Sequence, residues 1–299
     1  MRRSFLILAV VTAAVTASSA QTDLDAFMSQ VLTRRDDNWK KLQRYVLDED
    51  ETFQLTGPDA QRLYGSHREY TWFPRDGVFI RSPVKADGVS ISEDERRKAE
   101  ERWLGEEQGR EKRRLERENK DAKDNDAPPS LDELVRPGNE PGFVSTAYFM
   151  RFKFEPGHYA LVGRERLLDR DVLKIEYYPA QLFSEGRTRP NRRVRGRDER
   201  VQEKMNKVAL ITLWIEPTAH QILQYEFRNI DFDFLPGRYL ARIDDLRATM
   251  RMGQAFPDVW LPDTIGMRFA LTLAIGTIDG RYDVRYHDYR EATVRTRVR

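Results

Sequence analysis

The chain of 299 residues contains no cysteine, so it can form no disulfide and has no site for a lipid anchor attached through sulfur. A chain of this length can bury enough apolar surface to fold without a covalent cross-link. Histidine is also scarce, with four in the whole chain: His67, His158, His220 and His287. No two of them have the spacing of zinc ligands, and we therefore expect no metal site.

The common catalytic motifs are missing as well. The sequence has no H-E-x-x-H, no G-x-S-x-G elbow and no glycine-rich loop that would hold phosphate. His287 and Asp288, next to Tyr286 and Tyr289, form the pair that is best suited to orient a base. A strand face with its polar residues turned outward explains the same pattern more simply. We expect a protein that is not an enzyme and has no cofactor, with a hydrolase as a distant alternative.

An excess of charge of one sign is absent too. The chain has 51 basic and 49 acidic residues, and without Arg2 and Arg3 near the start the remainder has 49 of each. Such a balance gives no reason to expect a nucleic-acid partner.

Long apolar runs are nearly absent, and the clearest one stands at the N-terminus. Arg2 and Arg3 precede an apolar run over residues 5–15, and small residues follow it up to Ala20. This pattern predicts a secretory signal peptide over residues 1–20, cut after Ala20, because Ser18 and Ala20 suit signal peptidase. The run is too short to cross about 30 Å of hydrocarbon. We expect an exported protein, periplasmic or otherwise extracytoplasmic, that starts at Gln21.

What the chain does contain is a series of strand patterns, clearest in its last third. Residues 208–215 form an apolar, β-branched run that ends in a turn signal at residues 216–219. The return segment alternates Leu223, Tyr225 and Phe227 with polar residues, and a longer alternating run covers residues 265–275. Because strand side chains alternate between two faces, each run predicts a strand with one apolar face.

The remaining segments complete a single sheet-based domain over residues 21–299. Leu24, Phe27, Met28, Val31, Trp39, Leu42 and Val46 predict an amphipathic N-terminal helix, kinked or split at the charged residues 34–37. Further strands are predicted at residues 51–55, 68–73, 78–81, 148–154, 159–165 and 173–177. We expect a mainly β (α+β) fold of about ten strands. The sheet should be a curved, unclosed antiparallel half-barrel whose concave side receives the N-terminal helix.

Two charged segments interrupt this pattern. Residues 92–126 open with a capping box of Ser92 and Glu95 and contain few apolar residues besides Trp103, Leu104 and Leu115. They predict a helical insertion that is solvated and projecting, or else a docking arm for a partner. The loop at residues 184–204 is rich in arginine. It is either an exposed connection or a contact for a membrane surface or another anionic partner, through Arg187, Arg189, Arg192, Arg193, Arg195 and Arg197.

Several segments resemble the periplasmic lipoprotein-carrier superfamily, with its LolA/LolB-like fold. They are residues 213–218 followed by 222–227, residues 258–262 and residues 282–290. The resemblance implies an unclosed β-barrel with a hydrophobic cavity for acyl chains, covered by helices. The chain departs from the superfamily in its greater length, its insertion at residues 92–126 and its lack of an anchoring cysteine. No functional residue of the superfamily can be carried over.

From these patterns we expect a lipid, acyl chain or lipoprotein to bind in a hydrophobic concave sheet. The candidate cavity residues are Ile265, Met267, Phe269, Leu271, Leu273 and Ile275 on one strand face and Leu24, Phe27 and Val31 on the helix. The alternative is an interaction or scaffold protein that recruits a partner through the charged helix and the Arg-rich loop. A concave face filled by side chains would favour the scaffold, and an apolar void would favour the carrier.

Overall fold

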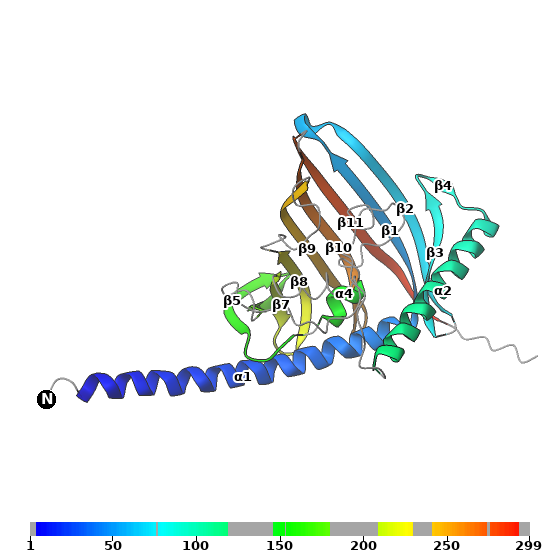
Figure 1. The fold of residues 1–299 in the computed structure, drawn as a ribbon. Coiled ribbons are helices and arrows are strands. Elements are labelled where there is room, and N and C mark those ends of the chain that lie inside the picture. The colour runs from blue at the N-terminus through cyan, green and yellow to red at the C-terminus, as the bar shows by residue number, and fades with distance from the viewer. Residues whose placement is uncertain are drawn as a thin grey trace, which may run out of the picture.

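The computed structural model describes residues 4–75, 77–118, 146–152, 154–179, 209–229, 241–273 and 276–292. In these residues eleven antiparallel strands form one open sheet, in the order β4-β3-β2-β1-β11-β10-β9-β8-β7-β6-β5 (Figure 1). The strands are β1 (Tyr45–Thr56), β2 (Arg62–Arg75), β3 (Val78–Ala86), β4 (Val89–Ser90), β5 (Tyr159–Leu167), β6 (Arg170–Tyr177), β7 (Ala209–Glu216), β8 (Gln221–Asn229), β9 (Ala241–Phe256), β10 (Val259–Leu273) and β11 (Gly276–Glu291). The expected class, a mainly β fold with an unclosed antiparallel sheet and an N-terminal helix, is confirmed.

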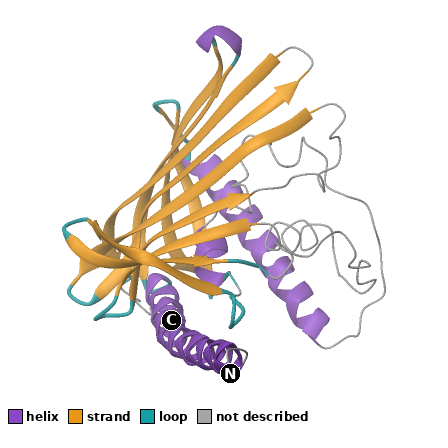
Figure 2. Cartoon of the chain, turned by 90° about the vertical axis from the view of Figure 1, so that its left-hand side faces the viewer, coloured by secondary structure: helices purple, strands orange, loops and turns teal. Residues whose placement is uncertain are grey.

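The two faces of the sheet differ as strand periodicity requires. On β1 the buried side chains are Tyr45, Leu47, Glu49 and Glu51, and the residues between them are more exposed. Cross-strand partners share a face. Glu51 lies opposite Val284 of β11 and opposite Arg68 of β2, which places these side chains on the same side. We call this side the inner face. The strands curl around it, as Figure 2 shows.

The helices are α1 (Ser4–Leu42), α2 (Glu93–Glu118) and α4 (Thr146–Arg151), with a short 3-10 turn η1 (Pro58–Ala60) between β1 and β2. No described helix has the length and apolar character needed to cross a membrane. Helix α1 runs without a break through residues 34–37, so the kink or split expected there is wrong. The charges are accommodated locally, because Arg35 pairs with Asp36 at 2.8 Å and Lys41 pairs with Asp37 at 3.1 Å one helical turn away.

Helix α1 lies across one end of the sheet, which we call the proximal end (Figure 1). This end includes the turns at residues 217–220 and 257–258. The ring of Phe27 lies 5.1 Å from that of His220, and Asn38 donates a hydrogen bond to the side chain of Gln221 at 2.9 Å. Arg34 donates to the carbonyl of Asp258 at 3.2 Å. The opposite, distal end contains η1, the last residues of β10 and the first residues of β11.

The predicted strand at residues 148–154 is wrong, because α4 occupies the first part of this segment. Phe149 and Met150 have no exposed surface, and Phe152 is 4% exposed. A strand on the sheet would turn such neighbouring side chains to opposite faces, whereas a helix inside the concave surface can bury them all. The ring of Phe149 packs edge-on against Phe227 of β8 at 4.8 Å. The inner face near the proximal end is therefore filled by α4 together with α1.

The expectation of a wholly solvated charged insertion is also wrong for the first half of α2. The capping box is present, since the Ser92 backbone N–H donates to the Glu95 carboxylate at 3.3 Å and the Glu95 backbone N–H donates to the Ser92 hydroxyl at 3.4 Å. Farther along, the indole of Trp103 donates to the carbonyl of Phe79 on β3 at 3.0 Å, and its ring lies edge-on to Trp72 at 5.5 Å. Strand β4 pairs with Lys85 and Ala86 at the end of β3 and leaves the rest of that edge of β3 without a partner among the described strands. Helix α2 lies against β3. Helix α2 has no continuous apolar face, and its half-buried apolar residues near β3 are Trp103 and Leu104.

Candidate functional site

Apolar side chains continue along the inner face beyond the region that α1 and α4 fill. On four neighbouring strands they are half-buried or more exposed, and all lie toward the distal end: Phe53 and Leu55 of β1, Tyr64 of β2, Ile278 of β11, and Phe269, Leu271 and Leu273 of β10. The register places Leu55 opposite Tyr64 and Leu271 opposite Ile278, which makes the surface continuous across the strands. We call this set the distal apolar face. In Figure 1 this end of β1, β2 and β11 extends well away from α1 and α4.

The candidate cavity residues divide between two environments. Ile265 is 1% exposed, Met267 is 3% exposed and Val31 has no exposed surface, so these three belong to the packed core. Leu24 and Phe27 pack against this core from α1. Phe269, Leu271 and Leu273 belong to the distal apolar face instead. Ile275 and the six arginines of the loop at residues 184–204 lie outside the described residues.

Phe269 lies directly over a glycine of the neighbouring strand. Gly280 of β11 is opposite Phe269 in the register, and a Cβ placed on Gly280 would come within 2.0 Å of the phenyl ring. The absence of a side chain at Gly280 therefore permits the present position of the ring. Phe269 links the packed core to the distal apolar face, since it contacts the core and remains half-buried.

A buried group of charged side chains lies on the inner face of β1 and β3, and we call it the Arg81 cluster. The guanidinium of Arg81 donates to Glu49 and, at 2.6 Å, to Glu51. The Tyr282 hydroxyl donates to Glu51 at 3.0 Å, and the Trp72 indole donates to Glu49. The guanidinium also stacks 3.6 Å from the centre of the Tyr70 ring. All three charged side chains are at most 9% exposed.

Burial controls the electrostatics of the Arg81 cluster. Desolvation raises the pKa of Glu49 and outweighs the opposing effect of Arg81. Burial alone would lower the pKa of Arg81, but Glu49 and Glu51 more than offset it, so the pKa lies well above its usual value. The guanidinium therefore stays charged. Burial likewise raises the pKa of Tyr70, which remains a neutral phenol.

The sequence did not reveal this cluster. Glu49 and Glu51 stand within the acidic run at residues 48–51, which is typical of an exposed segment. The available signal was the alternation of Leu47, Glu49, Glu51 and Phe53 on one parity, which places carboxylates in line with apolar residues. Only the pairing of β1 with β2 and of β2 with β3 brings Arg81 close enough to neutralise them.

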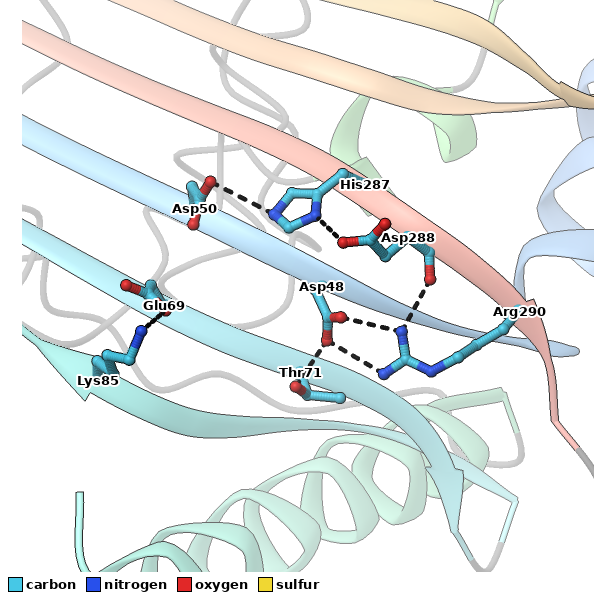
Figure 3. Close-up of polar contacts among 8 residues, drawn as sticks. All are labelled: Asp48, Asp50, Glu69, Thr71, Lys85, His287, Asp288 and Arg290. Carbon is cyan, nitrogen blue, oxygen red and sulfur yellow. Dashed lines mark hydrogen bonds and ion pairs between the residues drawn. The ribbon is translucent and has the colours of Figure 1, made fainter. Parts of the chain in front are cut away.

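The pair His287 and Asp288 lies on the opposite, outer face of the sheet (Figure 3). His287 Nδ1 lies 2.7 Å from Asp288, and Nε2 lies 3.3 Å from Asp50 of β1. Both ring nitrogens are therefore engaged by carboxylates. Nearby, Arg290 pairs with Asp48 at 2.9 Å. This outer network is a partly exposed set of ion pairs remote from the inner face, as expected for polar residues turned outward.

The described residues contain no group of three or more histidine and acidic side chains that could hold a metal ion. The structure thus brings together an apolar surface and a buried charged cluster on the inner face, and polar side chains on the outer face. Such an arrangement can hold an apolar ligand against the sheet.

No family model matches the chain, and no curated protein matches its sequence. Among solved structures, the chain is similar to an outer membrane lipoprotein-sorting protein domain from Vibrio parahaemolyticus. The two are 12% identical, the match covers 90% of this chain and 93% of that one, and the TM-score is 0.35. The chain is also similar to a DUF1329 family protein from Desulfovibrio piger, at 8% identity over 88% of this chain and 91% of that one, with a TM-score of 0.36.

A third similar structure describes lipid–protein interactions in lipovitellin. That match is 6% identical, covers 86% of this chain and 26% of the other, and has a TM-score of 0.31. At these identities and TM-scores the matches carry no argument about a ligand.

Proposed function

We propose that this protein is an exported, non-enzymatic binding protein that holds an acyl chain of a lipid or lipoprotein against its distal apolar face. The observation that carries the proposal is the continuous row of half-buried apolar side chains on β1, β2, β10 and β11. The inner face near the proximal end is filled by α1 and α4. The contacts of α1 and α4 described above fall near that end. An extended apolar surface of this kind favours an apolar ligand.

The extracytoplasmic location is part of the proposal and is supported by the predicted signal peptide. The described contacts of α1 with the sheet involve residues beyond Ala20, such as Leu24 and Phe27. Removal of residues 1–20 would therefore leave these contacts in place.

Titration with the fluorescent fatty acid cis-parinaric acid tests the proposal. We expect saturable binding by the wild-type chain and loss of binding in Phe269→Asp, because an unpaired carboxylate in an apolar site is costly. Arg268→Ser is the matched control, since Arg268 is exposed on the outer face of the same strand. Its affinity should equal that of the wild type.

A milder variant addresses the chance that Phe269→Asp does not fold. Gly280→Ala should push the Phe269 ring off its present position and weaken binding, because the added Cβ would overlap the ring. Gly266→Ala on the outer side of β10 is the control, where the nearest atom, Asp283 Oδ1, would lie 3.7 Å from the new Cβ. Absence of saturable binding by the wild type would remove the carrier function and leave the scaffold alternative.

A further inference from the structure

Arg68 is a cationic side chain beside the distal apolar face. It lies on the inner face of β2, opposite Glu51 in the register, in the row next to Phe53. Its side chain is half-buried, unlike that of Arg81, which is almost completely covered. On the inner face of β1, β2, β3, β10 and β11, the described charged residues are these two arginines with Glu49 and Glu51.

The carboxylate closest to Arg68 in the register is already engaged. Glu51 accepts from Arg81 at 2.6 Å and from Tyr282 at 3.0 Å. Within the described part of the chain, Arg68 makes no ion pair shorter than 4.0 Å with any carboxylate. Its polar neighbour is the Tyr70 hydroxyl, to which the guanidinium donates a hydrogen bond. A half-buried guanidinium that has this neutral partner and no carboxylate is partly desolvated, so an anion placed beside it would be stabilised more than at the open surface.

The surroundings of Arg68 keep it charged. Burial tends to lower its pKa, but the neighbouring Tyr70 and Glu51 offset that effect and the pKa lies above its usual value. Tyr64, which belongs to the distal apolar face, acts in the same direction. On the inner face of β2, only Ser66 stands between Arg68 and Tyr64, so the register places the cation next to the apolar surface.

We propose that Arg68 binds the carboxylate of a fatty acid whose chain lies along the distal apolar face. This inference rests on the proposed function and specifies the class of ligand. The four residue steps from Glu51 to Leu55 advance by about 14 Å along β1, which gives an acyl chain an apolar path that starts beside Arg68. A single carboxylate matches the planar guanidinium, which can donate two parallel hydrogen bonds to it. A doubly charged phosphate would fit less well, because Glu49 and Glu51 lie close by.

The test compares cis-parinaric acid with its methyl ester, which has the same chain and no charge. The wild type should bind the acid about tenfold more tightly than the ester, as expected for a hydrogen-bonded charge pair. Arg68→Gln should remove this preference by weakening the acid alone. Arg268→Gln on the outer face should retain it, and Arg68→Lys should retain part of it because the charge remains.

The outcomes separate this inference from the proposed function. Equal binding of acid and ester by the wild type, or an unchanged preference in Arg68→Gln, would overturn the role of Arg68 and leave acyl binding intact. Absence of binding for both probes would overturn the proposed function itself. The wild-type comparison needs no variant, so a poorly folded Arg68→Gln protein would not prevent a decision.

Discussion

Two carboxylates share one guanidinium in the Arg81 cluster, within an otherwise apolar surface. Burying three charges is costly, and their mutual attraction offsets this cost only when the geometry is good. Arg81 contacts both carboxylates, while the Trp72 indole and the Tyr282 hydroxyl supply further donors. The cluster is therefore stable as a unit and sensitive to the loss of its cation.

Replacing Arg81 by methionine should destabilise the fold by about 3–5 kcal/mol at neutral pH, because two buried carboxylates would lose their shared cation. Burial already raises the pKa of Glu49, and without Arg81 nothing comparable would oppose that effect. A carboxyl group whose pKa is raised in the folded state stabilises that state at low pH, and this contribution is lost as the pH rises through the raised pKa. The deficit of Arg81→Met should therefore shrink as the pH falls toward 4.5, the ordinary value for glutamate.

Urea unfolding at several pH values would measure this deficit. Lys85→Met is the matched control on the same strand, since Lys85 pairs with Glu69 at 2.8 Å on the more exposed outer face. That change should cost less than about 1 kcal/mol. A deficit for Arg81→Met that is equally small, or independent of pH, would contradict the prediction.

Among the helices, α2 shows how a highly charged segment can still be held by the fold. Its attachment depends on a few contacts with β3. Trp103 donates to the Phe79 carbonyl, and Glu100 accepts from the Ser82 hydroxyl at 2.5 Å. These contacts protect an edge of the sheet that would otherwise be open to pairing with another chain.

Trp103→Ala should therefore destabilise the protein by roughly 2 kcal/mol, through the loss of ring packing and one hydrogen bond. Arg97→Ala is the control on the same helix, because Arg97 is 64% exposed and pairs only at the surface with Asp94. Urea unfolding would give both values, and hydrogen exchange would show whether α2 loses protection first. If the two variants were equally stable, the helix would be solvated as the sequence suggested.

At the scale of the whole molecule, the sheet has one filled end and one apolar end. Figure 2 shows the strands curling over the helices, and the order of strands leaves β4 and β5 at the two margins. Helix α1 joins the proximal end to the N-terminal segment. Within α1 beyond Ala20, the side chain of Gln21 donates a hydrogen bond to Asp25 at 3.1 Å.

We expect the exported protein to begin at Gln21, because the N-terminal pattern predicts cleavage after Ala20. A chain that retains residues 1–20 should unfold at the same temperature as the chain that begins at Gln21, because the described contacts of α1 with the sheet involve residues beyond Ala20. N-terminal sequencing of the exported protein and a thermal melt would check this. A leader retained in soluble protein would contradict the predicted cleavage.

Much of the fold could be predicted from local patterns. The alternation at residues 223–227 and 265–273 identified strands β8 and β10, because a strand with one buried face repeats every two residues. The Ser92 and Glu95 pair located the start of α2 correctly. The apolar spacing of Met28, Val31 and Leu42 predicted the buried side of α1, and all three are at most 3% exposed. These features depend on interactions between residues close in the sequence.

Tertiary structure alone decided the rest. Strand β1 lies between β2 and the distant β11, and this pairing turns Glu49 and Glu51 from an apparently exposed acidic run into buried partners of Arg81. Residues 146–151 form a helix inside the concave side of the sheet, where consecutive side chains can all be buried. On β10, Ile265 and Met267 are in the packed core, whereas Phe269 and Leu271, on the same face of the same strand, are only half-buried. Periodicity specifies which face a side chain points to, but only the packing of distant elements determines what covers it.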